Sequence, residues 1–378
     1  MKLEIFSGMG KVFLGLVVAG FLISCSSAPE KPKATELAPN AGLLGVRLAW
    51  TAKIGVIDFP LDVNVSAHSV TVASSDGVVG SFDAGTGAAR WRTTVAAPIA
   101  AGVGSDGRFA ALVTRDNELL VLDAGHQIWH QKLPAQGFTA PLVAGGRVFV
   151  LTADRAVTAF DVESGQKLWN QQRPGESLVL RQGGVLLAVG DTLVAGLSGR
   201  LVGIDPSNGT IRWESAIASP RGTNDIERLV DLVGPVSRVG EVVCARAFQA
   251  SVGCVNTGRG SLLWTKPAFG YVGVHGDEKT VFGVESDGKV IAWRRADGER
   301  VWVSERLRYR GLTAPLVVGR SVAVGDASGL VHWLSREDGS PLTRVTTDGT
   351  AIVTAPVLAD GTLVVVTRGG GVFGFKPD

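Results

Sequence analysis

The chain has 378 residues, including 50 glycines, and a formal net charge of +2 at pH 7. A charge so close to neutral offers no basic stripe of the kind that nucleic acid requires, so composition argues against a nucleic-acid partner. The many glycines favour short strands joined by tight turns over a helical fold.

The N-terminus has the pattern of an export signal. Lys2 and Lys11 accompany an apolar run, residues 12–23, that is too short to span a bilayer. A basic start, a short hydrophobic segment and a small residue before a cleavage point are typical of a secretory signal peptide. We therefore expect residues 1–24 to be removed on export.

The end of this run, Leu22-Ile23-Ser24-Cys25, resembles the bacterial lipobox. The resemblance implies that Cys25 carries diacylglycerol and becomes the mature N-terminus; an unmodified thiol is the alternative. Several acyl chains would form a stable anchor. Ser26 follows, and the absence of Asp there is similar to lipoproteins of the outer membrane. We expect a protein on the periplasmic face of the outer membrane, attached through its lipid alone.

Residues 25–40 contain several prolines, mixed charge and few large apolar side chains. Such a composition cannot bury enough apolar surface to fold by itself. The sequence predicts a flexible tether here, followed by one folded domain over residues 41–378.

Tryptophan recurs about every forty residues, which is the length of one four-stranded propeller blade. Three copies share the pattern D-x3-G-x3-W, beginning at Asp83, Asp161 and Asp205. The Asp side chain opens a turn by bonding to the backbone, and Gly supplies a positive φ. We interpret the tryptophans as structural residues that pack between blades rather than as ligand contacts. They are Trp50, Trp91, Trp129, Trp169, Trp213, Trp264 and Trp302, with Thr343 at the eighth position.

The two ends of the domain complement each other. Residues 46–52 form an outer strand with no inner strands before it, and residues 371–378 form an inner strand with no outer strand after it. Together they would complete one blade. The predicted fold is all-β: an eight-bladed β-propeller with four-stranded antiparallel blades, the last closed by the N- and C-terminal strands.

Two motifs that suggest chemistry have simpler explanations. Residues 102–107 match G-x-G-x-x-G, but a strand rather than a helix follows, so we predict a turn. His126 and His130 have the spacing of metal ligands on a helix but not on a strand, and no third ligand stands near them. We expect neither a metal nor a cofactor.

Cys244 and Cys254 lie at equal distances from Gln249, the centre of a predicted hairpin. Equal distances place the two sulfur atoms opposite each other. In an exported protein this arrangement favours a cross-strand disulfide over free thiols.

Two consecutive links between blades, after Trp169 and after Trp213, are longer than the others. All such links emerge on one face of a propeller, so the extra residues should form one patch. Exposed Leu beside Arg and Asp suits a modest protein interface. Spacing alone leaves open that these links are merely solvated insertions.

The repeat resembles that of eight-bladed quinoprotein dehydrogenases, which bind pyrroloquinoline quinone on the propeller axis. Those enzymes share an adjacent Cys-Cys pair and calcium ligands, and this sequence has no adjacent cysteines. Blade packing alone does not carry function. A quinone-dependent enzyme is therefore the weaker alternative, and we expect no catalytic site and no small-molecule substrate.

The lipobox, tether, eight blades and two long links together resemble the BamB family of the outer-membrane Bam complex across essentially the whole chain. The resemblance implies that a Leu-x-Leu-Arg segment, here Leu178, Leu180 and Arg181, and an acid, here Asp231, contact the POTRA domains of BamA. Where the family has a second acidic residue, this sequence has Val233. We therefore expect the polar half of this contact to be weaker, or differently arranged, than the resemblance implies.

Two other roles remain. Apolar strand edges could hold nascent outer-membrane proteins by β-augmentation, although we expect ring closure to leave few free edges. A general periplasmic protein-binding propeller is the other alternative.

Overall fold

The computed structural model describes residues 32–378, except residue 60 and residues 175–177. The predicted signal peptide and Cys25 lie outside these residues. Over the described ranges, the chain contains no helix with the length and apolar character needed to cross a membrane.

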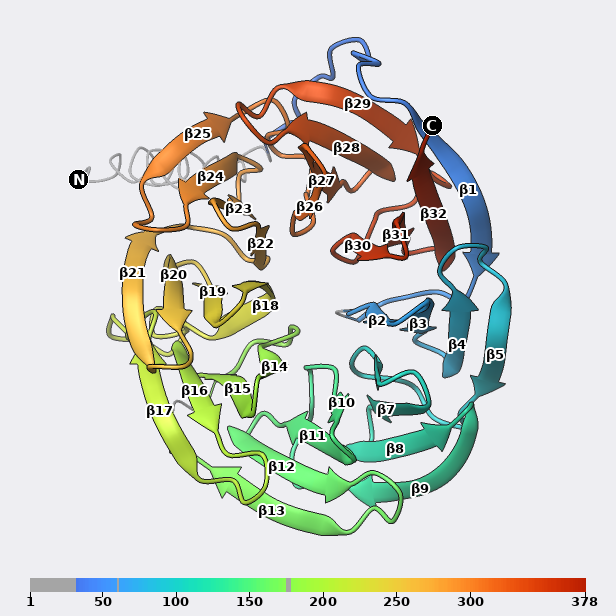
Figure 1. Ribbon diagram of the computed structural model, residues 1–378, viewed down its shortest axis with the longest axis vertical. Helices are drawn as coiled ribbons and strands as arrows, with labels where there is room; N and C mark the ends of the chain where they lie inside the picture. The colour runs from blue at the N-terminus through green and yellow to red at the C-terminus, as the bar shows by residue number, and fades with distance from the viewer. Residues whose placement is uncertain (1–31, 60, 175–177) are drawn as a thin grey trace, which may run out of the picture. The chain divides into compact units, whose positions relative to one another are not determined.

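The described chain forms eight sheets of four strands arranged in a ring (Figure 1). Blade 1 contains β2 (Asn64–Ser66), β3 (Ser69–Ala73), β4 (Val78–Asp83) and β5 (Ala89–Thr94); blade 2 contains β6 (Gly104–Ser105), β7 (Phe109–Val113), β8 (Glu118–Asp123) and β9 (His126–Lys132). Blade 3 contains β10 (Leu142–Ala144), β11 (Arg147–Leu151), β12 (Ala156–Asp161) and β13 (Lys167–Gln172); blade 4 contains β14 (Leu186–Val189), β15 (Thr192–Leu197), β16 (Arg200–Ile204) and β17 (Ile211–Ala216).

The second half of the ring repeats this plan. Blade 5 contains β18 (Leu232–Val239), β19 (Val242–Ala247), β20 (Ser251–Asn256) and β21 (Ser261–Pro267); blade 6 contains β22 (Val274–Gly276), β23 (Thr280–Val284), β24 (Val290–Arg294) and β25 (Arg300–Ser304). Blade 7 contains β26 (Leu316–Val318), β27 (Ser321–Gly325), β28 (Leu330–Ser335) and β29 (Pro341–Thr346); blade 8 contains β30 (Val357–Ala359), β31 (Thr362–Val366), β32 (Gly371–Pro377) and β1 (Val46–Lys53).

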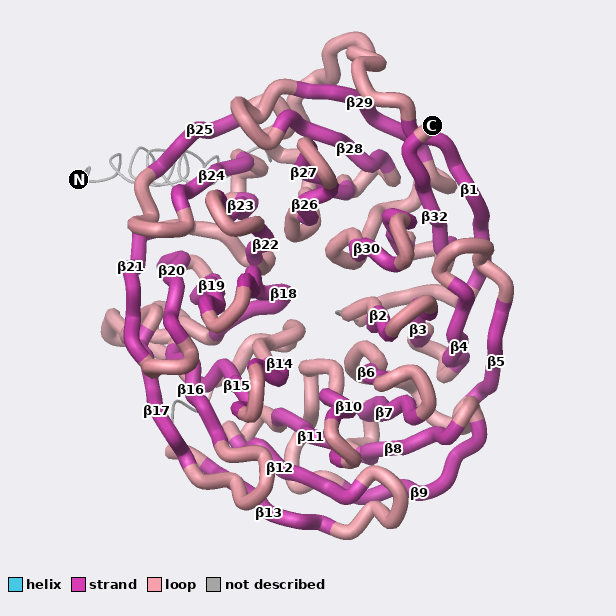
Figure 2. The backbone as a smooth tube through the Cα atoms, viewed as in Figure 1, coloured by secondary structure: helices cyan, strands magenta, loops and turns pink. Residues whose placement is uncertain are grey.

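Blade 8 is closed by the two ends of the chain, as predicted. Its strand order is β1-β32-β31-β30, and β1 pairs antiparallel with β32 from Val46 opposite Pro377 to Lys53 opposite Gly371. The innermost strands surround the axis and the outer strands form the rim (Figure 2). The eight-bladed propeller predicted from the sequence is confirmed.

Each tryptophan of the repeat packs on the turn of the following blade. Trp169 shows the arrangement: its indole nitrogen donates to the Pro206 carbonyl oxygen at 3.0 Å. Gly209 lies against the ring with a φ of 80°, and a Cβ there would stand 2.7 Å from the indole. Asp205 supports this turn by accepting a hydrogen bond from the Ser207 backbone N–H. The D-x3-G-x3-W pattern therefore builds both sides of an interface between blades.

The flexible tether predicted over residues 25–40 does not include residues 34–40, and residues 25–31 lie outside the described part of the chain. Residues 34–40 lie against blade 7, where the Asn40 side chain exchanges two hydrogen bonds with the backbone of Arg344. The Thr35 backbone N–H donates to the Arg308 carbonyl oxygen, and Leu37 packs on the core. The physical reason is that β29 is an outer strand whose free edge offers backbone groups to this segment.

Ring closure does not remove the sheet edges, contrary to our expectation. In the part of the chain that the structure describes, each outer strand has one strand neighbour, because the blades join through side-chain packing rather than through continuous backbone pairing. These strands are β1, β5, β9, β13, β17, β21, β25 and β29.

Candidate docking site

Two long links lie next to each other on one face of the ring. Loop A, residues 173–185, joins β13 to β14, and loop B, residues 217–231, joins β17 to β18. Every link runs from the end of an outer strand to the start of the next innermost strand, so all links share one face. Residues 175–177 of loop A lie outside the described part.

A buried clamp holds the two loops together. The Arg155 guanidinium, on the turn between β11 and β12, lies 3.0 Å from the Asp231 carboxylate of loop B. It also donates to the Leu178 carbonyl oxygen of loop A at 3.1 Å. The second Asp231 oxygen accepts a hydrogen bond from the Leu180 backbone N–H at 3.0 Å. The predicted contiguous patch is therefore present.

The three predicted contact residues of loop A differ in how far they are exposed to solvent. Leu180 is half-buried and lines a small cavity of about 60 Å³ together with Phe138 and Leu232. Leu178 is 39% exposed. Arg181 is exposed, and within the described part of the chain no ion pair or hydrogen bond engages its guanidinium. Leu178 and Arg181 are thus presented to solvent while Leu180 supports them.

The two positions predicted from the acidic segment do not face solvent freely. The Asp231 carboxylate is bound by Arg155 and by loop A, so it positions the loops. Val233 is buried in β18 opposite Arg246, which forms a buried ion pair with Glu285. An acid at position 233 would therefore enter the interior rather than a contact surface.

Loop B contributes an apolar side chain that the sequence did not single out. The Asn224 side chain accepts a hydrogen bond from the Glu227 backbone N–H, and Glu227 accepts one from the Thr223 backbone N–H, which holds the pKa of Glu227 below its usual range. This turn projects Ile226, which is 77% exposed beside a cavity of about 690 Å³. In the next link, Phe269 is also exposed. A local pattern could not reveal either, because both lie in irregular segments.

A disulfide braces the blade that follows loop B. Cys244 and Cys254 stand opposite each other on β19 and β20, and a disulfide joins them. The backbone N–H of Phe248, in the turn of the same hairpin, donates to the Asp231 carbonyl oxygen at 2.9 Å. This backbone hydrogen bond therefore attaches the hairpin to the end of loop B.

The glycine-rich match and the two histidines singled out in the sequence lie in blade 2. Residues 102–107, predicted as a turn, contain the short strand β6 (Gly104–Ser105) and the start of the turn that leads into β7. His126 and His130 are exposed on β9. In the ranges that the structure describes, no group of three His, Cys, Asp or Glu side chains could hold a metal ion.

The axis contains a cavity of about 410 Å³. Its wall includes Asp62, and burial raises the pKa of that carboxyl to about 6. The calcium and quinone of the dehydrogenases require a set of acidic ligands and an adjacent Cys-Cys pair. Both described cysteines are joined in blade 5, away from this wall. The residues present do not fit such a cofactor.

These features define an eight-bladed propeller whose prominent surface is a pair of clamped loops. A profile of the family described as "Outer membrane protein assembly factor BamB" matches residues 75–304. The BamB of Burkholderia pseudomallei is 36% identical over 94% of this chain and 94% of its own length, and that of Bordetella pertussis is 34% identical over 96% and 95%. The chain belongs to the BamB family.

Solved structures agree with this assignment. The crystal structure of BamB from Moraxella catarrhalis matches with a TM-score of 0.80 and 26% identity, over 88% of this chain and 99% of that one. A quinohemoprotein alcohol dehydrogenase from Comamonas testosteroni matches with a TM-score of 0.68 and 15% identity, over 90% and 78%. The second likeness shows a shared fold alone.

Proposed function

We propose that this protein is a non-catalytic scaffold subunit of the outer-membrane β-barrel assembly machinery. In this proposal lipidated Cys25 anchors it on the periplasmic face of the outer membrane, and loops A and B bind the POTRA domains of BamA. Family membership supports the role in assembly. The clamp formed by Arg155 and Asp231 supports the location, because it makes one surface from two loops.

The chemistry of the surface suits a protein partner. Leu178 and Ile226 are exposed apolar side chains on neighbouring loops, and Arg181 presents a guanidinium without an internal partner among the described residues. Arg is among the residues that most often dominate binding energy at interfaces, and exposed apolar side chains beside it suit a protein contact. Because the clamp pre-orders the loops, little conformational entropy is lost on binding.

Substitution of the presented residues tests the proposal. We expect Leu178→Ala combined with Arg181→Glu to weaken co-purification with BamA at least tenfold, since truncating interface anchors costs about 2 kcal/mol or more. The fold should survive because both side chains are exposed.

The matched control is Leu263→Ala combined with Arg300→Glu, which changes an exposed Leu and an exposed Arg on the outer strands β21 and β25. This control should bind BamA normally. Full binding by the loop A variant, with an unchanged thermal melting curve, would remove loops A and B from the interface.

A further inference from the structure

One interface between blades lacks its tryptophan. In seven blades the Trp of the outer strand stands opposite a smaller residue of the neighbouring strand, as in Gly203 opposite Trp213 and Ala292 opposite Trp302. In blade 7 the sizes are reversed: Trp333 on β28 stands opposite Thr343 on β29. In blade 7 the Trp therefore lies on the third strand, β28, and not on the outer strand, β29.

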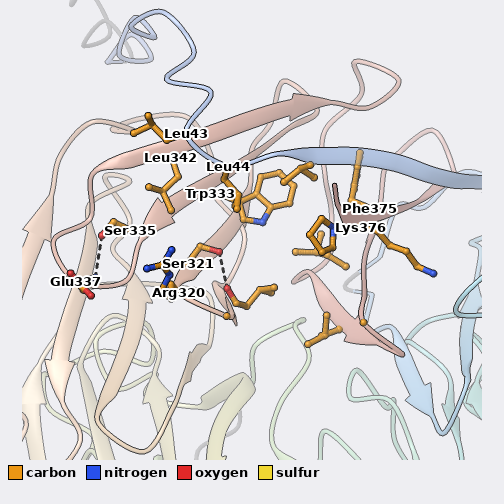
Figure 3. Close-up of a pocket in the computed structure, with 17 residues that line it drawn as sticks. Leu43, Leu44, Arg320, Ser321, Trp333, Ser335, Glu337, Leu342, Phe375 and Lys376 are labelled. Atoms are coloured by element: carbon orange, nitrogen blue, oxygen red, sulfur yellow. Dashed lines mark hydrogen bonds between the residues drawn. The ribbon is translucent and has the colours of Figure 1, made fainter.

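The reversal leaves space between blades 7 and 8. Trp333 is buried and packs edge-on against Phe375, with ring centroids 6.1 Å apart. Beside Leu342, the neighbour of Thr343, a cavity of about 440 Å³ remains (Figure 3). Its apolar wall includes Leu44, Val46, Leu358 and Leu363.

This cavity contains an unused hydrogen-bond donor. The indole nitrogens of Trp50, Trp129, Trp169, Trp264 and Trp302 each donate to a backbone carbonyl oxygen of the next blade. Within the described residues, the indole nitrogens of Trp91, Trp213 and Trp333 have no such acceptor, and of these three residues only Trp333 lines this cavity. The Trp333 indole nitrogen is not among the described polar atoms that are both buried and unpaired, so it is open to the cavity and can donate to an oxygen that a ligand brings.

The rim of the cavity is positively charged. Arg320 is exposed and, among the described residues, forms no ion pair. Lys376 donates to the Gly85 carbonyl oxygen at 3.2 Å and forms no ion pair with a described carboxylate. Glu337 is the single acidic residue among those that line the cavity. An acidic segment would therefore be favoured at the mouth.

We propose that this cavity is a second binding site, which takes an aromatic side chain from an extended, acidic segment of a partner protein. The propeller itself fills the equivalent spaces with aromatic rings. A peptide also supplies backbone carbonyl oxygens for the Trp333 indole, which the hydrocarbon of an acyl chain cannot do. The site is independent of the proposed docking to BamA, because the β26–β27 turn and the end of β32 lie on the face opposite to the inter-blade links.

Indole signals in nuclear magnetic resonance test the proposal. The chain has nine Trp residues, so protein labelled with ¹⁵N at tryptophan gives nine indole N–H signals, and Trp333→Phe identifies the one from the cavity. The probe is unlabelled acetyl-Gly-Asp-Trp-Asp-Gly-amide. We expect it to shift the Trp333 signal, while a peptide with Ala in place of Trp should bind at least tenfold more weakly. Replacing both Asp residues of the probe with Lys should also weaken binding.

Three results would overturn the proposal: an unmoved Trp333 signal at millimolar probe, equal shifts with the Ala peptide, or shifts produced by decanoate and not by the probe. The last would make the cavity an acyl-chain site.

A blocking variant supplies the control within the protein. Leu358, at the cavity wall, is 44% exposed, and Leu168, on β13 of blade 3, is 41% exposed. Leu358→Trp should abolish the probe-induced shift by narrowing the cavity, whereas Leu168→Trp should leave it intact. The dispersion of the remaining indole signals reports whether each variant is folded. Loss of the shift in both folded variants, or in neither, contradicts the assigned location.

Discussion

At the scale of single residues, the contacts of Asp231 in the structure differ from the role that the sequence implied for it. The family resemblance implies a contact with a partner, yet its carboxylate binds Arg155 and the Leu180 backbone N–H within the chain. Both side chains of the ion pair are mostly buried, so the pair is shielded from solvent. Asp231 would then act on binding by positioning Leu178 and Arg181 rather than by touching the partner.

Removal of this carboxylate should loosen the loops. We expect Asp231→Ala to lower the free energy of unfolding by about 2–3 kcal/mol, because the Arg155 charge and the Leu180 N–H lose their partner. Hydrogen exchange at the Leu180 amide should accelerate more than at β16, and Asp231→Glu should restore part of the protection. An unchanged exchange rate at Leu180 in the Ala variant would rule out the positioning role.

At the scale of elements, the turn and the tryptophan form one device. The Gly of each turn must have a positive φ and must leave room for the indole of the preceding blade, so two separate constraints select Gly. Gly209 has both, with Trp169 against it. Gly190, at the tip of the β14–β15 hairpin, has a φ of 59°, but a Cβ added there would meet no other atom within 4 Å.

This pair separates the two constraints. Gly190→Ala should cost about 1 kcal/mol through the backbone alone, while Gly209→Ala should cost about 1–3 kcal/mol more, because its methyl group overlaps the Trp169 ring. Urea unfolding of both variants measures the difference. Equal losses would show that the indole contact does not select Gly209.

At the scale of the whole molecule, stability depends on closing the ring. Among the described strands, β1 pairs with β32 alone, and the buried Val372 and Phe375 of β32 pack with residues of the neighbouring elements. The first and last strands of the domain are therefore joined only by non-covalent pairing.

Deletion of residues 371–378 tests this closure. The variant loses the partner of β1 and exposes the apolar sides of blade 8, so we expect the cooperative thermal transition to disappear. Deletion of Pro377 and Asp378 alone retains most of the β1–β32 register and should change the melting temperature little. A cooperative transition in the longer deletion, close to that of the intact chain, would show that the ring does not need its shared blade.

The sequence by itself determines the blades, because the information is local. The turns at Asp83, Asp161 and Asp205, and the facing of Cys244 and Cys254 in one hairpin, depend on residues close in the chain. Periodic spacing then sets the number of blades, and the unmatched end strands indicate how the ring closes.

Only the tertiary structure decides which residues far apart in the chain come into contact when the ring closes. The clamp joins Arg155 to Asp231 over 76 positions, and Asn40 binds β29 over 304 positions. The cavity beside Trp333 arises from two facing blades, and neither blade's pattern contains it. The physical reason is that contacts across the ring depend on which surfaces meet after closure, and no short stretch of residues specifies them.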